Sequence, residues 1–161
     1  MPQPAQRTAR WKLRLIDLYP PYLGAGVRVR DLGTDPLSFD VEMKLRWWNR
    51  NYFGTQFGGS LYSMCDPFFC LILVEALGPD RYAVWDKAAA IRFRRPGRGA
   101  VRARFAIPRE RVEAIRAEAD REGVAEPLFE VEISDDRGEV IAAVEKRLHV
   151  RRRDAAPGPP A

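Results

Sequence analysis

Histidine and cysteine, which carry much of the metal and nucleophile chemistry of proteins, are nearly absent from this chain of 161 residues. There is one histidine, His149, and there are two cysteines, Cys65 and Cys70. The cysteines lie in one expected helix and point to different sides of it, which suits neither a disulfide nor a metal pair. We therefore expect no zinc site and no other metal or cofactor, and we interpret both cysteines as small core residues. His149 is interpreted as a surface or edge residue of the last strand.

A targeting segment and a clear membrane span are also lacking. The N-terminal stretch MPQPAQRTARWK contains no apolar signal core. The most apolar run, Leu61 to Leu77, is marginally short for a membrane span and contains Asp66, Pro67 and Glu75. These observations predict a soluble cytoplasmic protein with no membrane partner.

The remaining composition is that of one soluble globular domain, with 46% hydrophobic and 30% charged residues. The net charge of +5 suits a polyanionic partner, and it equally suits a solvated surface. Arginines such as Arg102 and Arg104 lie on strand faces that match acidic residues such as Asp40 and Glu42, so cross-strand pairing explains many of them and we expect no nucleic acid. A subset within residues 94–98 could bind the phosphates of coenzyme A.

Hydrophobic periodicity divides the chain into strands with one apolar face and helices between them. Residues 1–8 are expected to be loose, and an amphipathic helix over residues 9–19 should end at Pro20-Pro21. Pro108 and Gly123 bound a charged surface helix, and residues 153–161 have the composition of a disordered tail. Strands are expected over residues 27–32, 37–47, 82–95, 101–107, 129–133 and 140–150.

The chain is organised around residues 49–78, a glycine-rich entry followed by the most apolar run. A one-sided antiparallel sheet must cover its apolar face, and the element apolar enough to do so is the helix expected from Gly58 to Leu77. This predicts a single α+β domain over residues 9–152, in which a curved antiparallel sheet of about six strands wraps around a long central helix. That architecture is the hotdog fold.

Asp66 lies inside the apolar run, and a lone acid on a core helix is costly unless it is paired or functional. Either Asp66 caps a shorter helix that begins at Pro67, or Pro67 kinks a continuous helix beside it; the register favours the kink. Lys87 is the expected partner of Asp66 if the strand over residues 82–95 alternates without a bulge. Lys87 could instead meet the phosphates of a substrate or extend outward into solvent.

The segment from Asn51 to Asp66, NYFGTQFGGSLYSMCD, resembles the central signature of hotdog-fold acyl-CoA thioesterases, in the phenylacetyl-CoA thioesterase-like branch. That branch typically reads Asn-x-x-Gly-x-x-His-Gly-Gly, then six residues, then an acid, and the spacing here matches through Asp66. The FGGSLYSM-x-DPFF run and the following VWDKAA are also similar to a bacterial subgroup described as tetrameric acyl-CoA thioesterase or as a domain of unknown function.

By this resemblance, the backbone N–H groups of Gly58 and Gly59 would hold the thioester carbonyl oxygen, on which negative charge grows during attack. Asp66 corresponds to the carboxylate that activates water or attacks directly, and Asn51 to the asparagine that orients water or the carbonyl. The substrate would be an acyl-CoA or another pantetheine thioester. The site would form between protomers of a dimer or a dimer of dimers.

Phe57 stands where the branch usually has histidine, so the glycine amides would have to suffice. Ser60 and Ser63 lie near Asp66 by helical spacing, but without a histidine base we expect water binding or packing and not an activated nucleophile. Tyr62, a turn from Asp66, could line an acyl pocket or belong to the core. The candidate substrate-binding residues are Phe57, Ser60, Tyr62, Ser63 and Lys87.

The sequence therefore predicts an acyl-CoA thioesterase-like hydrolase with Asp66 as general base or nucleophile. One alternative is a non-catalytic hotdog protein that binds acyl-CoA or an acyl carrier and has lost turnover with the histidine. Another is a hydratase-type hotdog enzyme, whose usual Asp and His pair this chain does not supply in the expected spacing. Hydrolysis should depend on Asp66, whereas binding alone should survive Asp66→Asn.

Overall fold

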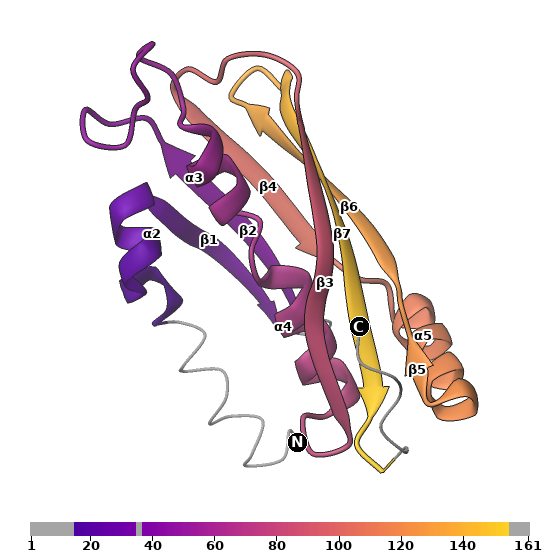
Figure 1. The fold of residues 1–161 in the computed structure, drawn as a ribbon. Coiled ribbons are helices and arrows are strands. Elements are labelled where there is room, and N and C mark those ends of the chain that lie inside the picture. Colours follow the sequence, from indigo (N-terminus) through magenta and orange to yellow (C-terminus); the bar gives the residue numbers. More distant parts are fainter. Residues whose placement is uncertain (1–14, 35–36, 155–161) are drawn as a thin grey trace.

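The structure is a computed structural model and describes residues 15–34 and 37–154 (Figure 1). The expected loose N-terminus (residues 1–8), the first part of the helix expected over residues 9–19, and residues 155–161 of the expected tail lie outside the described residues.

Two short helical segments open the described chain, a 3-10 turn η1 (Ile16–Leu18) and a helix α2 (Pro20–Ala25). The turn η1 ends at Leu18, before Pro20-Pro21 as the sequence predicts, but the two prolines then form the first turn of α2, which the sequence analysis did not predict. Proline suits that position, since first-turn N–H groups have no partner within the helix. Gly26 ends α2 in the left-handed conformation, with φ of 78°.

A hairpin follows, formed by β1 (Val27–Thr34) and β2 (Leu37–Lys44). The alternation predicted for β2 is confirmed, because its odd-numbered residues from Leu37 to Met43 are buried. The strand ends at Lys44 and not near Trp47, however. Trp47 and Trp48 lie beyond it with both side chains exposed and their rings packed against each other, 5.6 Å between centroids.

The central helical path consists of α3 (Gly58–Ser63) and α4 (Phe68–Leu77), which follow one another along the inner side of the sheet (Figure 1). The prediction of one kinked helix needs correction, because the chain leaves the helix for several residues around a cis Asp66-Pro67 bond. Pro67 has no N–H to bond back into the helix, and here the helix breaks at this point and does not merely kink. Nor does the Asp66 side chain cap α4.

The second half of the chain contributes β3 (Tyr82–Phe93), β4 (Ala100–Ala106), α5 (Arg109–Glu122), β5 (Val124–Ala125), β6 (Leu128–Asp135) and β7 (Val140–Arg152). The described strands form one seven-stranded antiparallel sheet in the order β1-β2-β4-β6-β7-β3, with the short β5 paired to β7. It has one strand more than the six expected because β5, only two residues long, leaves no sequence pattern. The long strand β3 ends one side of this order.

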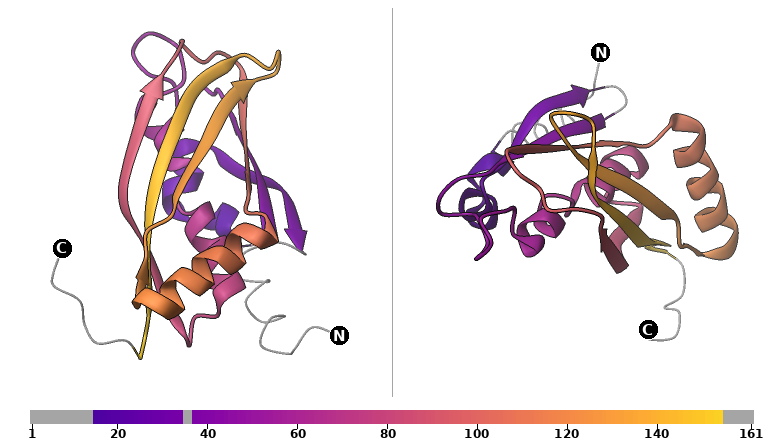
Figure 2. Two further views of the ribbon diagram at one scale, coloured as in Figure 1. Left: turned by 90° about the vertical axis from the view of Figure 1, so that its right-hand side faces the viewer. Right: turned by 90° about the horizontal axis from the view of Figure 1, so that it is seen from above.

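The sheet curves around the central helices, which fill its concave side (Figures 1 and 2). Phe68 of α4 packs against Phe39 of β2 and Phe105 of β4, with 4.9 Å between ring centroids in both pairs. The path from Gly58 to Leu77 is long and apolar enough to cross a membrane by length and composition alone. Here, however, it forms the core of the sheet. The buried residues of α4 are Phe68, Phe69, Ile72, Leu73 and Leu77.

Candidate active site

Asp66 lies in the break between α3 and α4, and its side chain remains 48% exposed. Behind it, the ammonium group of Lys146 on β7 is buried, with only 1% of the side chain exposed. Lys146 Nζ donates to Asp66 Oδ1 at 2.8 Å and to Asp86 Oδ2 at 2.8 Å. The Tyr62 ring faces the same ammonium, with its centroid 5.5 Å from Nζ. One buried cation therefore holds two carboxylates from different elements.

A bulge in β3 decides which of its charged residues faces this cluster. Tyr82, Val84 and Asp86 share the inward face at the start of β3, and the pairing with β7 shifts between Asp86 and Ala88. Lys87 is therefore the extra residue and turns outward, and Ile91 faces inward beyond it. Lys87 Nζ instead pairs with Glu126 at 2.6 Å, with 38% of its side chain exposed. The prediction of an inward Lys87 beside Asp66 is thus wrong, because it assumed alternation without a bulge.

The three charges set each other's protonation. Burial raises the pKa of Asp66, but the contacts with Lys146 and Asp86 outweigh it and hold this pKa below its usual value. The pKa of Asp86 is raised, first by burial and then by the neighbouring Asp66 carboxylate. Burial lowers the pKa of Lys146, yet the two carboxylates raise it above its usual value. The buried ammonium therefore favours the ionised form of the Asp66 carboxylate.

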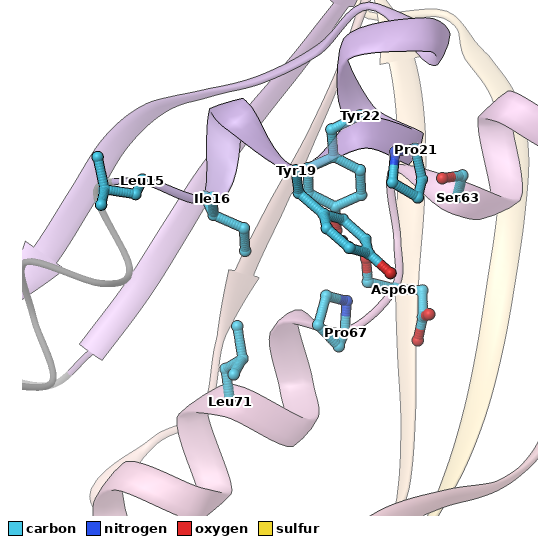
Figure 3. A pocket seen from close by; sticks show the side chains of 9 residues that line it. All are labelled: Leu15, Ile16, Tyr19, Pro21, Tyr22, Ser63, Asp66, Pro67 and Leu71. Carbon is cyan, nitrogen blue, oxygen red and sulfur yellow. The ribbon is translucent and has the colours of Figure 1, made fainter.

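A pocket of about 580 Å³ opens beside Asp66, between the N-terminal segments and the helix break (Figure 3). Its wall on one side consists of Ser63, Asp66 and Pro67, and its opposite side is aliphatic. Tyr22 lies between them, 2% exposed, and its hydroxyl donates to the backbone oxygen of Asp66. Burial and the Asp66 charge raise the pKa of Tyr22, which keeps this hydroxyl a donor.

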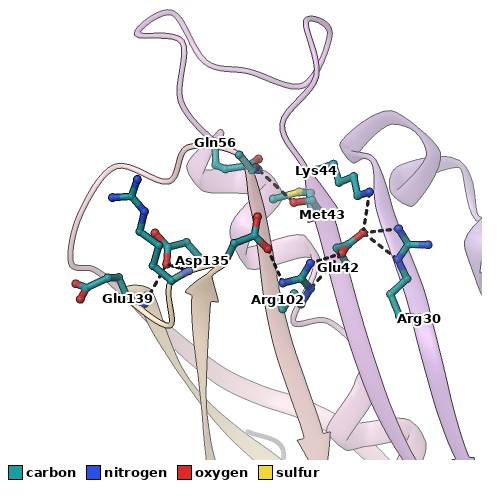
Figure 4. Close-up of polar contacts among 11 residues, drawn as sticks. Arg30, Glu42, Met43, Lys44, Gln56, Arg102, Asp135 and Glu139 are labelled. Atoms are coloured by element: carbon teal, nitrogen blue, oxygen red, sulfur yellow. Dashed lines mark hydrogen bonds and ion pairs between the residues drawn. The ribbon is translucent and has the colours of Figure 1, made fainter.

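The glycine-rich entry forms a loop held by its own side chains. Asn51 Oδ1 accepts from the N–H groups of Phe53 and Thr55, each at 3.0 Å, and Asn51 Nδ2 donates to Thr55 Oγ1 at 2.9 Å. The amide of Gln56 donates to the carbonyl oxygen of Gly99 at 2.9 Å and to that of Met43 at 3.3 Å (Figure 4). Asn51 therefore shapes the loop in this chain, and Gln56 ties it to the sheet.

Gly58 and Gly59 begin α3, where no side chain caps the helix. A Cβ at Gly59 would lie 2.6 Å from the Phe57 ring and one at Gly58 would lie 3.0 Å from the Phe93 ring, so these two exposed rings would have to shift to admit a side chain. Phe57 and Ser60 line a hollow of about 460 Å³ together with Trp48. Within one chain these glycines lie a helix length away from Asp66.

A further hollow of about 630 Å³ lies between the glycine-rich loop and the β3–β4 connection, where Arg94, Arg95 and Arg98 contribute to its walls. Arg95 is paired with Glu139 there. On the outer face of the sheet, the buried Glu42 accepts from Arg30 and Arg102 (Figure 4), and Arg104 pairs with Asp40 at 2.9 Å. These contacts confirm the expected cross-strand pairing of arginines with Asp40 and Glu42.

The two thiols are not candidates for the nucleophile. Burial raises the pKa of Cys65 to about 12 and that of Cys70 to about 11, so both stay protonated at neutral pH. The imidazole of His149 stacks on Trp85, with 4.2 Å between ring centroids, and lies 3.2 Å from Glu126. In the part of the chain that the structure describes, no three His, Cys, Asp or Glu side chains are placed to bind a metal ion.

Lys146 and Asp86 are the site residues that the sequence analysis missed. A signal for Lys146 was present, because it shares its parity on β7 with the buried residues Val144, Leu148 and Val150. A lysine within an apolar alternation must find a buried counter-charge, and Asp66 was the unexplained acid. Asp86 shares its parity with Tyr82 and Val84 at the start of β3, but the opposite parity of Ile91 beyond the bulge conceals that signal.

A curved antiparallel sheet wrapped around a central helical path defines a hotdog-fold protein. The structure of a Pseudomonas aeruginosa protein described as a probable thioesterase matches with a TM-score of 0.81 and 24% identity, over 95% of this chain and 99% of that one. A Haemophilus influenzae thioesterase matches with a TM-score of 0.63 and 15% identity, over 91% and 92% of the two chains.

A variant of the phenylacetic acid degradation protein PaaI from Thermus thermophilus matches with a TM-score of 0.55 and 22% identity, over 81% of this chain and 97% of that one. At these identities the matches show the fold, and the predicted hotdog fold is confirmed. The profile of the family DUF4442, a domain of unknown function, matches residues 8–150, and the chain belongs to this family. No curated protein matches it in sequence.

Proposed function

We propose that this protein is a thioester hydrolase that acts on an acyl-CoA or another pantetheine thioester, with Asp66 as general base or nucleophile. The observation that carries the proposal is the Asp66 carboxylate, half exposed in a pocket wall and held at 2.8 Å by the buried ammonium of Lys146. A carboxylate kept ionised and fixed in orientation is what either role requires. The thioesterase-like fold of the structural relatives supports this choice of chemistry.

As general base, Asp66 takes a proton from water while the water oxygen attacks the thioester carbon. The tetrahedral intermediate then collapses to the carboxylic acid and releases the thiolate. The protonated Asp66 gives the proton to the thiolate and is ionised again. As nucleophile, Asp66 first forms a mixed anhydride with loss of the thiolate, and water then hydrolyses the anhydride. In both routes Lys146 fixes the carboxylate without touching the substrate.

The oxyanion donors we propose are the backbone N–H groups of Gly58 and Gly59, with Asn51 shaping the loop that presents them. The six residues of α3 span about 9 Å and Asp66 lies beyond their C-terminal end, so we propose that the glycines and Asp66 of one protomer do not serve the same thioester. We therefore propose that the site lies between protomers of a dimer or a dimer of dimers. The long edge strand β3 is the surface that a second copy could extend.

The other candidate residues lie in different hollows of the chain. Ser63 lines the Asp66 pocket, Phe57 and Ser60 line the neighbouring hollow, and Tyr62 faces Lys146. We propose that the arginines in the wall of the 630 Å³ hollow bind the phosphates of the thiol carrier; they are Arg94, Arg95 and Arg98. Lys87 is not a proposed substrate-binding residue, because it forms an ion pair with Glu126. The free, protonated thiols are consistent with a cytoplasmic protein.

The alternative is an acyl-thioester-binding protein without turnover. Two observations favour it: Phe57 replaces the histidine usual in the resembling branch, and Lys146 draws negative charge away from Asp66. Such a protein would keep the pocket and bind acyl-CoA without releasing a thiol.

Thiol release from short, long and aromatic acyl-CoAs by wild type, Asp66→Asn and Asp80→Asn separates the two functions. Asp80 is an exposed acid in the turn after α4 and serves as the matched control. We expect a loss of about a hundredfold or more in Asp66→Asn alone, the scale of a general base. Equal turnover in all three proteins would remove Asp66 from the mechanism, and binding without any turnover would establish the acyl-binding alternative.

A further inference from the structure

The pocket beside Asp66 has a polar side and an apolar side. Ser63 and Asp66 lie at one side, and the aliphatic side chains of Leu15, Ile16 and Leu71 lie at the other (Figure 3). Its volume of about 580 Å³ is within the range of small-molecule sites. This polarity matches a molecule with one reactive polar group and an apolar tail.

The middle of the pocket is built from fixed aromatic rings. Tyr22 is buried, stacks on Phe68 with 6.1 Å between centroids, and is held by its hydroxyl on the backbone of Asp66. Tyr19 packs edge-on against Tyr22 at 5.6 Å. The N-terminal segments thus form a wall anchored to the helix break that carries Asp66, and not a separate surface.

The described residues that line the pocket disfavour a second anion. Among the described residues that line it, none is Lys or Arg, and its one charged group is the Asp66 carboxylate. Lys146 lies behind Asp66 and is already bonded to two carboxylates. A ligand tail ending in a carboxylate would lose its hydration against Leu15, Ile16 and Leu71, and none of the described lining residues offers it a cation.

We infer that this pocket binds the acyl group of the substrate, and that it selects neutral apolar acyl groups over acyl groups that end in a carboxylate. The assignment rests on the proposed function for the identity of the thioester. The thioester carbon lies on the Asp66 side, and the tail extends past Tyr22 toward Ile16 and Leu71. The pocket wall formed by η1 and α2 is therefore the specificity-determining element of the chain.

Titration calorimetry with coenzyme A and a series of S-alkyl-CoA thioethers tests the inference without requiring turnover. Each methylene buried in the pocket should raise affinity by about fourfold in wild type, until the pocket is full. An S-alkyl-CoA of equal length that ends in a carboxylate should bind no better than coenzyme A.

Ile16→Trp and Leu71→Trp fill the pocket from two walls, and Leu18→Trp adds the same ring at a 62% exposed position of η1 outside it. In both filling variants we expect affinity no longer to rise with alkyl chain length, while affinity for coenzyme A stays at the wild-type value. In Leu18→Trp we expect affinity to rise with chain length as in wild type. Two positions are used so that the test remains possible if one variant does not fold. Thermal unfolding shows whether each variant is folded.

A chain-length gain that persists in both folded filling variants would overturn the inference, as would its absence in wild type or tight binding of the carboxylate-ended analogue. Thiol release from octanoyl-CoA, measured on the same proteins, separates this result from the proposed function. If thiol is released and filling the pocket changes neither turnover nor affinity, the hydrolase is supported and the acyl pocket is contradicted. If filling abolishes the gain in affinity with chain length but no thiol is released, the acyl pocket is supported and the hydrolase is contradicted.

Discussion

Lys146 and Asp66 are eighty residues apart in the chain, and their charged atoms are 2.8 Å apart in the fold. The pair joins the buried face of β7 to the break in the central helix, and Asp86 on β3 completes it from the other side. The lysine is buried and Asp66 is half exposed. The buried charge therefore serves to fix an accessible one, which is an arrangement that binding or catalysis can use.

Replacing Lys146 by methionine should destabilise the protein by about 3 kcal/mol, the low end for breaking a buried ion pair, because half of Asp66 can still be hydrated. Lys87→Met is the matched control, since Lys87 lies on the neighbouring strand and pairs with Glu126 near the surface. It should change stability by less than about 1 kcal/mol. Urea unfolding at pH 7 measures both, and equal effects would contradict a special role for the buried lysine.

The same variant should change the pH dependence of turnover. In wild type, Lys146 holds the pKa of Asp66 below its usual value, so kcat/KM should not fall until the pH drops below the usual range of aspartate. Without the ammonium, Asp66 and Asp86 face each other, and one carboxyl must then hold a proton to higher pH. The acidic limb of kcat/KM should therefore move up by about one pH unit or more in Lys146→Met. An unmoved limb would show that Asp66 is not the titrating base.

Much of this architecture follows from local patterns, and the exceptions have identifiable causes. The alternation of β2 and the narrow apolar stripe of α5 predict their buried faces correctly, since each depends only on the period of the element. The outward turn of Lys87 depends on one extra residue in β3, which no periodicity encodes. Proline likewise has two meanings: Pro20 starts a helix and Pro67 interrupts one.

Lys146 shows a different limit. Its position in the apolar alternation of β7 was readable from the sequence, but its partner was not, because the contact joins elements far apart in the chain. An acid and a lysine that are each out of place can be matched only when the fold brings them together. The site was therefore half predictable: Asp66 from its local context, its partners only from the tertiary structure.

Glu42 should contribute to stability in a pH-dependent way. It is 5% exposed and accepts from Arg30 and Arg102. Burial raises its pKa, but the arginines outweigh burial and hold that pKa below the ordinary value of 4.5. A carboxyl with a depressed folded-state pKa contributes stability above its unfolded pKa and loses it as the pH falls through the folded pKa.

Glu42→Gln should therefore cost about 1–3 kcal/mol at pH 7, and its difference from wild type should shrink as the pH is lowered below 4.5. Asp40→Asn breaks the more exposed pair with Arg104 and should cost less than about 1 kcal/mol. Urea unfolding of the three proteins between pH 3 and pH 7 measures the effect. A difference that is constant with pH would contradict the assignment.

Two glycines near the acyl pocket wall should respond oppositely to alanine. Gly26 has φ of 78°, and a Cβ there would lie 2.7 Å from Asn49 Nδ2, so Gly26→Ala should cost more than about 1 kcal/mol. Gly24 lies within α2 with no atom within 4 Å of a Cβ, and Gly24→Ala should stabilise by about 0.5–1 kcal/mol. Thermal unfolding compares them, and a stabilising Gly26→Ala would show that α2 does not end as described.

The edge strand β3 provides the last test, which concerns assembly. Along this strand Ala88, Ala89 and Ala90 are exposed, and so are the rings of Trp85 and Phe93. A long, exposed edge of small and apolar residues is a template for another strand, and natural proteins seldom leave one uncovered. If a second copy pairs there, Ala89→Arg should place a charge in the contact and yield monomers by sedimentation.

Ala106→Arg, an exposed change on β4 away from that edge, should leave the assembly intact. If one thioester is served by Gly58 of one protomer and Asp66 of the other, as proposed above, the monomeric Ala89→Arg protein should also lose thiol release, although it folds. A monomer with full turnover would place the whole site within one chain and rule out shared glycine amides. An assembly unchanged by Ala89→Arg would contradict pairing at β3. The exposed rings of Trp47 and Trp48, which follow β2, would then be the next candidate contact between copies.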